Sequence, residues 1–187
     1  LELGGFAVHR QRPPGGGAGP LVITAHRADR PFGLCAYGPC DITPARPQTD
    51  GTYQTTYGRV EARLQAPAGR GLWSAFWMVA ADDSAELDIM EQNGREPTIV
   101  SGTAHIYKYT PDSGISRVFQ LPASAPATSF HIYAIDWSPE HIIWSVDGLP
   151  YHTVRRSDTN HWAFNRPLLL HPTLAAVTPP TRHPPHT

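Results

Sequence analysis

Residues 130–154 read, in chain order, FHIYAIDW, SPE, HIIWSV, DG, LP and YHTV. Aromatic and β-branched residues fill the first, third and last of these segments, and such residues are typical of β-strands. The dipeptide Asp147-Gly148 favours a tight hairpin turn between two of them. The stretch therefore predicts three consecutive strands, at residues 130–137, 141–146 and 151–154.

Alternation of side-chain character predicts further strands on the amino-terminal side. In residues 57–64, Val60, Ala62 and Leu64 take one face and charged residues take the other, as in a half-buried strand. Residues 72–79 form a nearly continuous apolar run, which predicts a strand buried on both faces. Because no 3.6-residue periodicity persists over three turns, we expect an all-β fold, an antiparallel β-sandwich.

The amino-acid composition limits the kinds of partner that the protein can bind. Hydrophobic residues make up 40% of the 187 positions, enough to bury the core of one domain. The formal net charge of -1 provides no basic surface for nucleic acid. The longest apolar stretch, residues 72–81, is far shorter than the roughly 20 residues that a membrane span needs. We therefore expect neither a nucleic-acid nor a membrane partner.

Both ends of the chain lack a regular pattern. Residues 1–20 contain a run rich in proline and glycine and are expected to form an irregular lead-in. Residues 166–187 carry six prolines and three histidines, and only residues 168–170 resemble a strand. Because proline cannot donate to a ladder, we expect an irregular tail that supplies no central strand. The expected organisation is one domain over residues 1–187 with irregular ends.

The two cysteines, Cys35 and Cys40, define no disulfide framework. A local disulfide between them and two unpaired thiols are equally compatible with their spacing. The CxxC spacing of a metal site is absent from the sequence.

Residues 86–91 read ELDIME and carry three carboxylates. In a regular strand Glu91 would share a face with Leu87 and Ile89, and an unpaired carboxylate buried there is costly. A β-bulge near Ile89 and Met90 removes this conflict, because one extra residue rotates Glu91 onto the face of the other two carboxylates. We therefore expect the bulge, with all three carboxylates lining one surface of a sheet.

Carboxylates held on one rigid strand suit glycoside hydrolysis. One of them attacks or stabilises the anomeric carbon, and another protonates the leaving oxygen. Neighbouring like charges push their pKa values apart, so that one group is ionised while another holds a proton. A calcium site and a plain solvated acidic edge are alternative interpretations. The spacing alone leaves these three interpretations open.

The order of several segments resembles that of glycoside hydrolase family 16, the retaining endo-β-glucanases of the laminarinase type. The resemblance runs from about Leu21 to Phe164. Besides the acidic motif it rests on LVITA at 21–25, YGRVEARL at 57–64, GLWSAFWM at 71–78, GTAH at 102–105, FHIYAIDW at 130–137 and IWSVDG at 143–148. It implies a jelly-roll, concanavalin-like sandwich whose concave sheet carries the carboxylates.

The resemblance assigns three catalytic residues. Glu86 matches the family's nucleophile, Glu91 its general acid/base, and Asp88 the aspartate that hydrogen-bonds the nucleophile and helps to set its protonation. It thus implies attack by Glu86 on the anomeric carbon. Glu91 would first protonate the leaving oxygen and then activate a water molecule.

Three further residues are candidates for substrate binding. Trp73 and Trp77 resemble the family's cleft aromatics, against which a glucosyl ring stacks, and core packing is the alternative for one of them. Their separation of four residues places both on the same strand face, which suits either role. His105 matches a family histidine in the cleft, and a structural histidine is the alternative.

The resemblance implies a secreted, monomeric enzyme that cleaves β-1,3-linked glucan, a polysaccharide, at internal linkages. Secretion follows from the family alone, because the sequence shows no signal segment. No cofactor and no catalytic metal are implied, and the ligands of the structural calcium ion often seen in the family cannot be assigned here. Mixed-linkage β-1,3-1,4-glucan and galactan are alternative substrates, since the same motif serves both within the family.

The sequence departs from the family pattern in three places. Asp82-Asp83-Ser84-Ala85 replaces the family's Trp-Pro pair, so one sugar-stacking platform is expected to be missing. The amino-terminal region lacks the opening strand, and the tail replaces the closing strands expected after Phe164. This pattern suggests a copy that is truncated at both ends or disrupted by a frame shift. A non-catalytic β-glucan-binding module and an inactive fragment are therefore the alternative functions.

Overall fold

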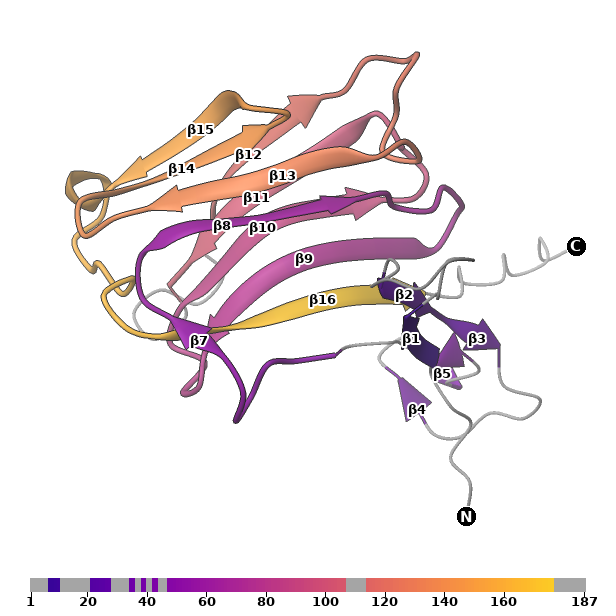
Figure 1. Ribbon diagram of the computed structural model, residues 1–187, viewed down its shortest axis with the longest axis horizontal. Helices are drawn as coiled ribbons and strands as arrows, with labels where there is room; N and C mark the ends of the chain where they lie inside the picture. The colour runs from indigo at the N-terminus through magenta and orange to yellow at the C-terminus, as the bar shows by residue number, and fades with distance from the viewer. Residues whose placement is uncertain are drawn as a thin grey trace, which may run out of the picture.

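A computed structural model describes the backbone of residues 7–10, 21–27, 34–35, 38–39, 42–43, 47–106 and 114–176. In this part of the chain two antiparallel sheets pack on a common core (Figure 1). Its only helical segment is a single 3-10 turn at Arg156–Asp158. None of the described residues belongs to a helix with the length and apolar character to span a membrane.

The larger sheet contains six strands in the order β12-β11-β10-β9-β16-β7. Every neighbouring pair in it is antiparallel. Its strands are β7 (Gln54–Thr55), β9 (Leu72–Ala80), β10 (Glu86–Asn93), β11 (Ile99–His105), β12 (Gly114–Gln120) and β16 (Leu168–Ala176).

The second sheet has the order β15-β14-β13-β8. Its strands are β8 (Gly58–Leu64), β13 (His131–Trp137), β14 (His141–Val146) and β15 (Leu149–Arg155). Asp147 and Gly148, with φ of 50° and 80°, form the turn between β14 and β15. The three strands expected between residues 130 and 154 are thereby confirmed.

Three pairs of short strands lie in the amino-terminal region. They are β1 (Ala7–Arg10) with β2 (Leu21–Thr24), β3 (His26–Arg27) with β6 (Ile42–Thr43), and β4 (Leu34–Cys35) with β5 (Gly38–Pro39). The predicted irregular lead-in is therefore wrong for residues 7–10, because pairing with β2 satisfies backbone groups of a segment that has no strong pattern of its own. Cys40 lies outside the described residues, so the state of the two cysteines stays a prediction.

Apolar side chains of both sheets form one core between them. In β13, Tyr133, Ile135 and Trp137 point inward and are at most 3% exposed, whereas Ile132 on the outer face is 38% exposed. The alternation in the sequence has thus become one buried and one outward face. The predicted all-β sandwich is confirmed.

Strand β9 differs from the prediction of a strand buried on both faces. Phe76 and Met78 point into the core, whereas Trp73 is 40% exposed and Trp77 is half-buried. The physical reason is that the second sheet covers only one face of the larger sheet. Much of the other face of β9 is left outward, and this is the face on which the site is built.

Strand β16 overturns the expectation of an irregular tail for residues 168–176. It lies between β9 and β7 (Figure 1) and pairs with β9 over its whole length. The pairing runs from Leu168 opposite Ala80 to Ala176 opposite Leu72. The tail thus supplies a strand of the larger sheet that the sequence analysis excluded.

Pro172 is compatible with β16 because of the direction of its nitrogen. On the side away from β9, the backbone N–H of Leu170 donates to the hydroxyl of Thr49, and the backbone oxygen of Leu170 accepts from the N–H of Thr49. Pro172 follows two residues later and therefore faces the same side. Strand β7 pairs only with Leu168 and Leu169. No neighbouring strand in the described sheet therefore requires an N–H donor from the proline.

Candidate active site

A β-bulge interrupts the acidic segment of β10. Asp88 pairs with Trp77 of β9, and Met90 pairs with the adjacent Phe76, so Ile89 has no partner on that strand. The register with β11 shifts at the same place. The bulge predicted near Ile89 and Met90 is confirmed.

The bulge turns the three carboxylates to one face of the larger sheet. Glu86, Asp88 and Glu91 pair with three alternate residues of β9. Because paired residues in an antiparallel sheet project from the same face, the three carboxylates share the outward face, which we call the carboxylate face. On the core side, Leu87 and Ile89 are at most 2% exposed. The structure thus brings the predicted acids together.

An indole from the second sheet supports the bulge. Trp144 of β14 is fully buried and donates from its Nε1 to the backbone oxygen of Asp88 at 2.8 Å. A regular ladder would direct this oxygen to a neighbouring strand, whereas at the bulge it points into the core and takes a side-chain donor. The hydrogen bond thus links the core to the bulge that keeps Glu91 on the same face as Glu86 and Asp88.

Replacing Trp144 with phenylalanine is expected to lower the free energy of unfolding by about 1–3 kcal/mol beyond the loss of packing, because the buried Asp88 oxygen loses its donor. Trp162→Phe is the matched control, since the buried Nε1 of Trp162 has no hydrogen-bond partner among the described residues. Urea unfolding of both variants measures the difference. Equal losses in the two variants would contradict a role for this hydrogen bond.

His105 lies beside Asp88 on the carboxylate face. Its Nε2 is 3.1 Å from Oδ2 of Asp88, whose side chain is only 5% exposed. The hydrogen bond with Asp88 raises the pKa of His105, and the charges of Glu86 and Glu91 act in the same direction, whereas burial opposes them. The carboxylates therefore favour the charged form of His105. His105 therefore lies among the carboxylates, and its assignment as a cleft histidine that binds substrate stays a prediction.

A cation could be held here by Glu86, Asp88 and His105, whose ligand atoms all lie within 4.8 Å of one another. This donor set does not fit the structural calcium ion of the family, because calcium takes six to eight oxygen ligands and one of these three ligands is an imidazole nitrogen. The ligands of that calcium ion remain unassigned. Two of these three side chains, His105 and Asp88, already form an ion pair with each other.

The side chain of Glu91 is poised to hold a proton near neutral pH. Burial raises the pKa of Glu91 to about 7, and the negative charge of Asp88 adds to the effect. The indole of Trp73 donates from Nε1 to Oε1 of Glu91 at 3.1 Å, and this hydrogen bond lowers the pKa again in part. A carboxyl group with such a pKa can deliver a proton and then take one back.

Comparison of the sequence with known proteins identifies the family of this chain. The family model of Glycosyl hydrolases family 16 matches residues 43–176. The chain belongs to this family. The beta-glucanase of Rhodothermus marinus is 36% identical to it over 170 residues, which cover 82% of this chain and 57% of that protein. The endo-1,3-1,4-beta-glycanase ExsH of Rhizobium meliloti is 32% identical over 143 residues, covering 75% of this chain and 29% of that protein.

Solved structures of family 16 proteins show the same fold. The endo-beta-1,3-glucanase from Pyrococcus furiosus has a TM-score of 0.72 and 34% identity, covering 81% of this chain and 62% of that one. The laminarinase catalytic domain from Thermotoga maritima also has a TM-score of 0.72, with 32% identity, covering 81% of this chain and 64% of that one. The predicted jelly-roll sandwich is confirmed. In each of these four comparisons the chain spans less than two thirds of the other protein.

The two candidate tryptophans of this family 16 chain differ in their surroundings. Trp77 stacks on His171 of β16, with ring centroids 4.7 Å apart and planes 25° apart, and donates from Nε1 to Oγ1 of Thr173 at 2.9 Å. One ring face of Trp77 is therefore covered by His171, and its N–H is already bonded to Thr173. Trp73 is more exposed, at 40%, and its N–H is directed to Glu91. Trp73 is the better placed of the two to stack on a sugar.

The sequence analysis missed the two residues of β16 that contact Trp77. His171 is 2% exposed, and Thr173 holds the indole N–H. A signal was available, because Leu168, Leu170 and Leu174 repeat at even spacing and leave the residues between them for the opposite face. The prolines of the tail argued against a strand and so concealed this pattern.

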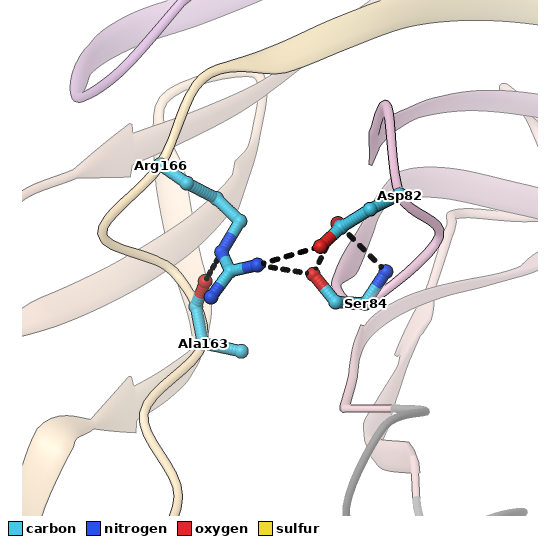
Figure 2. A network of polar contacts seen from close by, with 4 residues as sticks. All are labelled: Asp82, Ser84, Ala163 and Arg166. Carbon is cyan, nitrogen blue, oxygen red and sulfur yellow. Dashed lines mark hydrogen bonds and ion pairs between the residues drawn. The ribbon is translucent and has the colours of Figure 1, made fainter.

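The turn that leads into Glu86 is fixed by an arginine from the segment before β16 (Figure 2). Arg166 donates from Nη1 to Oγ of Ser84 at 2.5 Å and to Oδ2 of Asp82 at 3.2 Å. Its Nε donates to the backbone oxygen of Ala163 at 3.0 Å. The hydroxyl of Ser84 donates to Asp82 at 2.5 Å, and this bond lowers the pKa of Asp82. A polar network thus occupies the segment in which the family pattern led us to expect a Trp-Pro pair.

Proposed function

We propose that this chain is an endo-acting glycoside hydrolase that cleaves β-1,3-linked glucan with retention of configuration. The observation that carries the proposal is the bulged strand β10, which turns Glu86, Asp88 and Glu91 to one face. The similarity to the beta-glucanase of Rhodothermus marinus supports a β-glucan as the substrate, and that to the endo-beta-1,3-glucanase from Pyrococcus furiosus supports the β-1,3 linkage.

The reaction has two displacements at the anomeric carbon. Glu86 bonds to this carbon as the bond to the leaving sugar breaks, and Glu91 gives its proton to the leaving oxygen. A water molecule then attacks the glycosyl-enzyme ester, Glu91 takes a proton from it, and the Glu86 carboxylate is released. Each displacement inverts the carbon, so that the product retains its configuration.

The neighbours of the two glutamates tune these steps. The charge of Asp88 helps to keep Glu91 protonated before the first displacement, whereas the positive charge of His105 lowers the pKa of Glu91. We assign Asp88 the further task of hydrogen-bonding the nucleophile, as in the family motif. Opposed influences of this kind let Glu91 act first as an acid and then as a base.

A carboxylate cluster favours an enzyme over a non-catalytic glucan-binding module. Neutral sugars are bound by aromatic faces and hydrogen bonds, and no buried acid is required for that. Asp88 is 3% exposed and Glu91 is desolvated enough to raise its pKa to about 7. Placing such groups together is destabilising, and catalysis is the use that needs it. Secretion and a monomeric state are further parts of the proposal and follow from the family pattern.

The test is incubation of the purified chain with laminarin, mixed-linkage β-1,3-1,4-glucan, galactan and cellulose. Internal cleavage of laminarin to short oligosaccharides is expected, and proton NMR should show the β-anomer as the first product. Cleavage of the mixed-linkage glucan alone would replace the proposed substrate. An initial α-anomer would contradict the retaining mechanism, and binding without cleavage would favour the binding module.

Hydrolysis is expected to fall as the pH rises through about 7, because the first displacement needs Glu91 in its protonated form. Trp73→Phe removes the hydrogen bond that lowers the pKa of Glu91, so this alkaline limb should move to higher pH. The measurement is kcat/KM against pH for both proteins, on a soluble substrate. An unmoved limb in Trp73→Phe would show that another group sets it.

A further inference from the structure

A pocket of about 500 Å³, within the range of natural ligand sites, lies at the β7 edge of the larger sheet and is lined by Asp50, Gly51, Thr52, Tyr53, Gln54 and Leu169. The strand register places it on the carboxylate face. Leu169 pairs with Val79, and Val79 pairs with Glu86, so all three project from the same face. The core residue Leu168 points the other way, with 0% exposure.

The pocket is remote from the proposed cleavage point. The row of paired residues runs from Glu86 through Val79 and Leu169 to Gln54. Three strand spacings of about 4.8 Å place Gln54 about 14 Å from Glu86. A single sugar ring at Glu86 cannot reach that far, whereas a glucan chain laid across the strands can.

The turn that forms the pocket is fixed to the sheet. The hydroxyl of Thr49 donates to the backbone oxygen of Tyr53 at 2.6 Å and accepts from the N–H of Leu170 at 3.0 Å. The backbone N–H groups of Thr52 and Tyr53 both donate to the Thr49 oxygen, at 3.0 and 2.9 Å. Gly51, with φ of 70°, takes the left-handed position that this turn requires. The pocket is therefore organised before any ligand binds.

The chemistry of the pocket suits a sugar ring. Tyr53 is 55% exposed, an unusually open position for an aromatic residue. Asp50 and Gln54 are exposed too, and neither side chain is hydrogen-bonded to another residue in the described part of the chain. A pyranose offers an apolar ring face and a rim of hydroxyl groups. An aromatic ring beside a carboxylate and a carboxamide complements both.

We propose that this pocket binds a glucosyl unit of the substrate remote from the bond that is cleaved. Tyr53 is the stacking platform, and Asp50 and Gln54 bind the hydroxyl groups. The inference rests on the proposed function, because it takes the occupant to be the same glucan chain. Residues 82–85 lack the sugar-stacking platform that the family pattern led us to expect. The pocket would give the protein such a platform at another place, beside β7.

The test compares a β-1,3-linked heptasaccharide with the trisaccharide, which is too short to reach both Glu86 and the pocket. Tyr53→Ala should lower the ratio of kcat/KM for the long substrate to that for the short one by about fivefold. Tyr53→Phe should restore the ratio, since it keeps the ring face. Phe130→Ala, which removes a 44%-exposed aromatic next to β13 of the other sheet, is the matched control and should leave the ratio unchanged.

Equal losses on both substrates, or no loss on either, would overturn the proposal. A binding measurement separates it from the proposed function. In the Glu86→Gln background, calorimetry should show about fivefold weaker binding of the heptasaccharide when Tyr53 is also replaced with alanine. If the native chain hydrolyses no glucan but this difference appears, the pocket stands and the catalytic proposal falls. If hydrolysis occurs and the difference is absent, the pocket falls alone.

Discussion

Glu86→Ala is expected to lower the kcat for glucan hydrolysis by about 10⁴-fold or more, because removal of a nucleophile leaves only binding and acid catalysis. Oligosaccharide binding should persist, since the proposed stacking on Trp73 and hydrogen bonds to the sugar do not need the nucleophile. Kinetic assays with an activated aryl glycoside measure the first effect and calorimetry measures the second.

Azide provides the control for this variant. In the space left by the Glu86 side chain, azide can attack the anomeric carbon directly, so part of the turnover should return with a glycosyl azide of inverted configuration as the product. Glu86→Gln, which retains the volume, should gain less from azide. Full residual activity in Glu86→Ala would place the nucleophile elsewhere.

Removal of residues 171–187 is expected to prevent stable folding. It deletes most of β16, including the residues paired with β9 from His171 to Ala176. The edge of β9 would then expose unpaired backbone groups, and Trp77 would lose both its stacking and its hydrogen-bond partner. The total stability of a domain this size is about 5–15 kcal/mol, which such a loss can exceed.

Truncation after Ala176 is the reference for that experiment, because the difference between the two truncated chains reports the strand residues alone. Circular dichroism during heating gives the melting temperature of each chain. A melting temperature in the shorter chain close to that of the reference would show that β16 contributes little, as the proline content of the tail first suggested.

Local patterns predicted the sandwich because several strands, β8 and β13 among them, carry their own alternation. In β13 the inward residues Tyr133, Ile135 and Trp137 can be picked out by counting alone. The bulge was predictable for a different reason, because a regular strand would have buried Glu91 with Leu87. In both cases the alternative arrangement would raise the free energy of the folded state, because it would expose apolar side chains or bury a carboxylate. The residues concerned can be identified in the sequence.

The features that escaped prediction depend on partners far away in the chain. Pro172 argues against a strand until the direction of its nitrogen is known, and that direction follows from the bonds of Leu170 to Thr49. Trp144 reads as a core residue, and nothing near it in the sequence indicates that its N–H meets the Asp88 oxygen. Such contacts between distant residues can be identified only once the two sheets are assembled in the structure.

The place of β16 in the larger sheet sets the order of events during protein synthesis. It is made after every other described strand, yet it lies between β9 and β7 and carries His171 and Thr173 to the carboxylate face. A nascent chain still on the ribosome at residue 165 therefore holds β9 with an open edge. Folding of the larger sheet must wait until β16 has emerged from the ribosome, and chaperones have that interval in which to act.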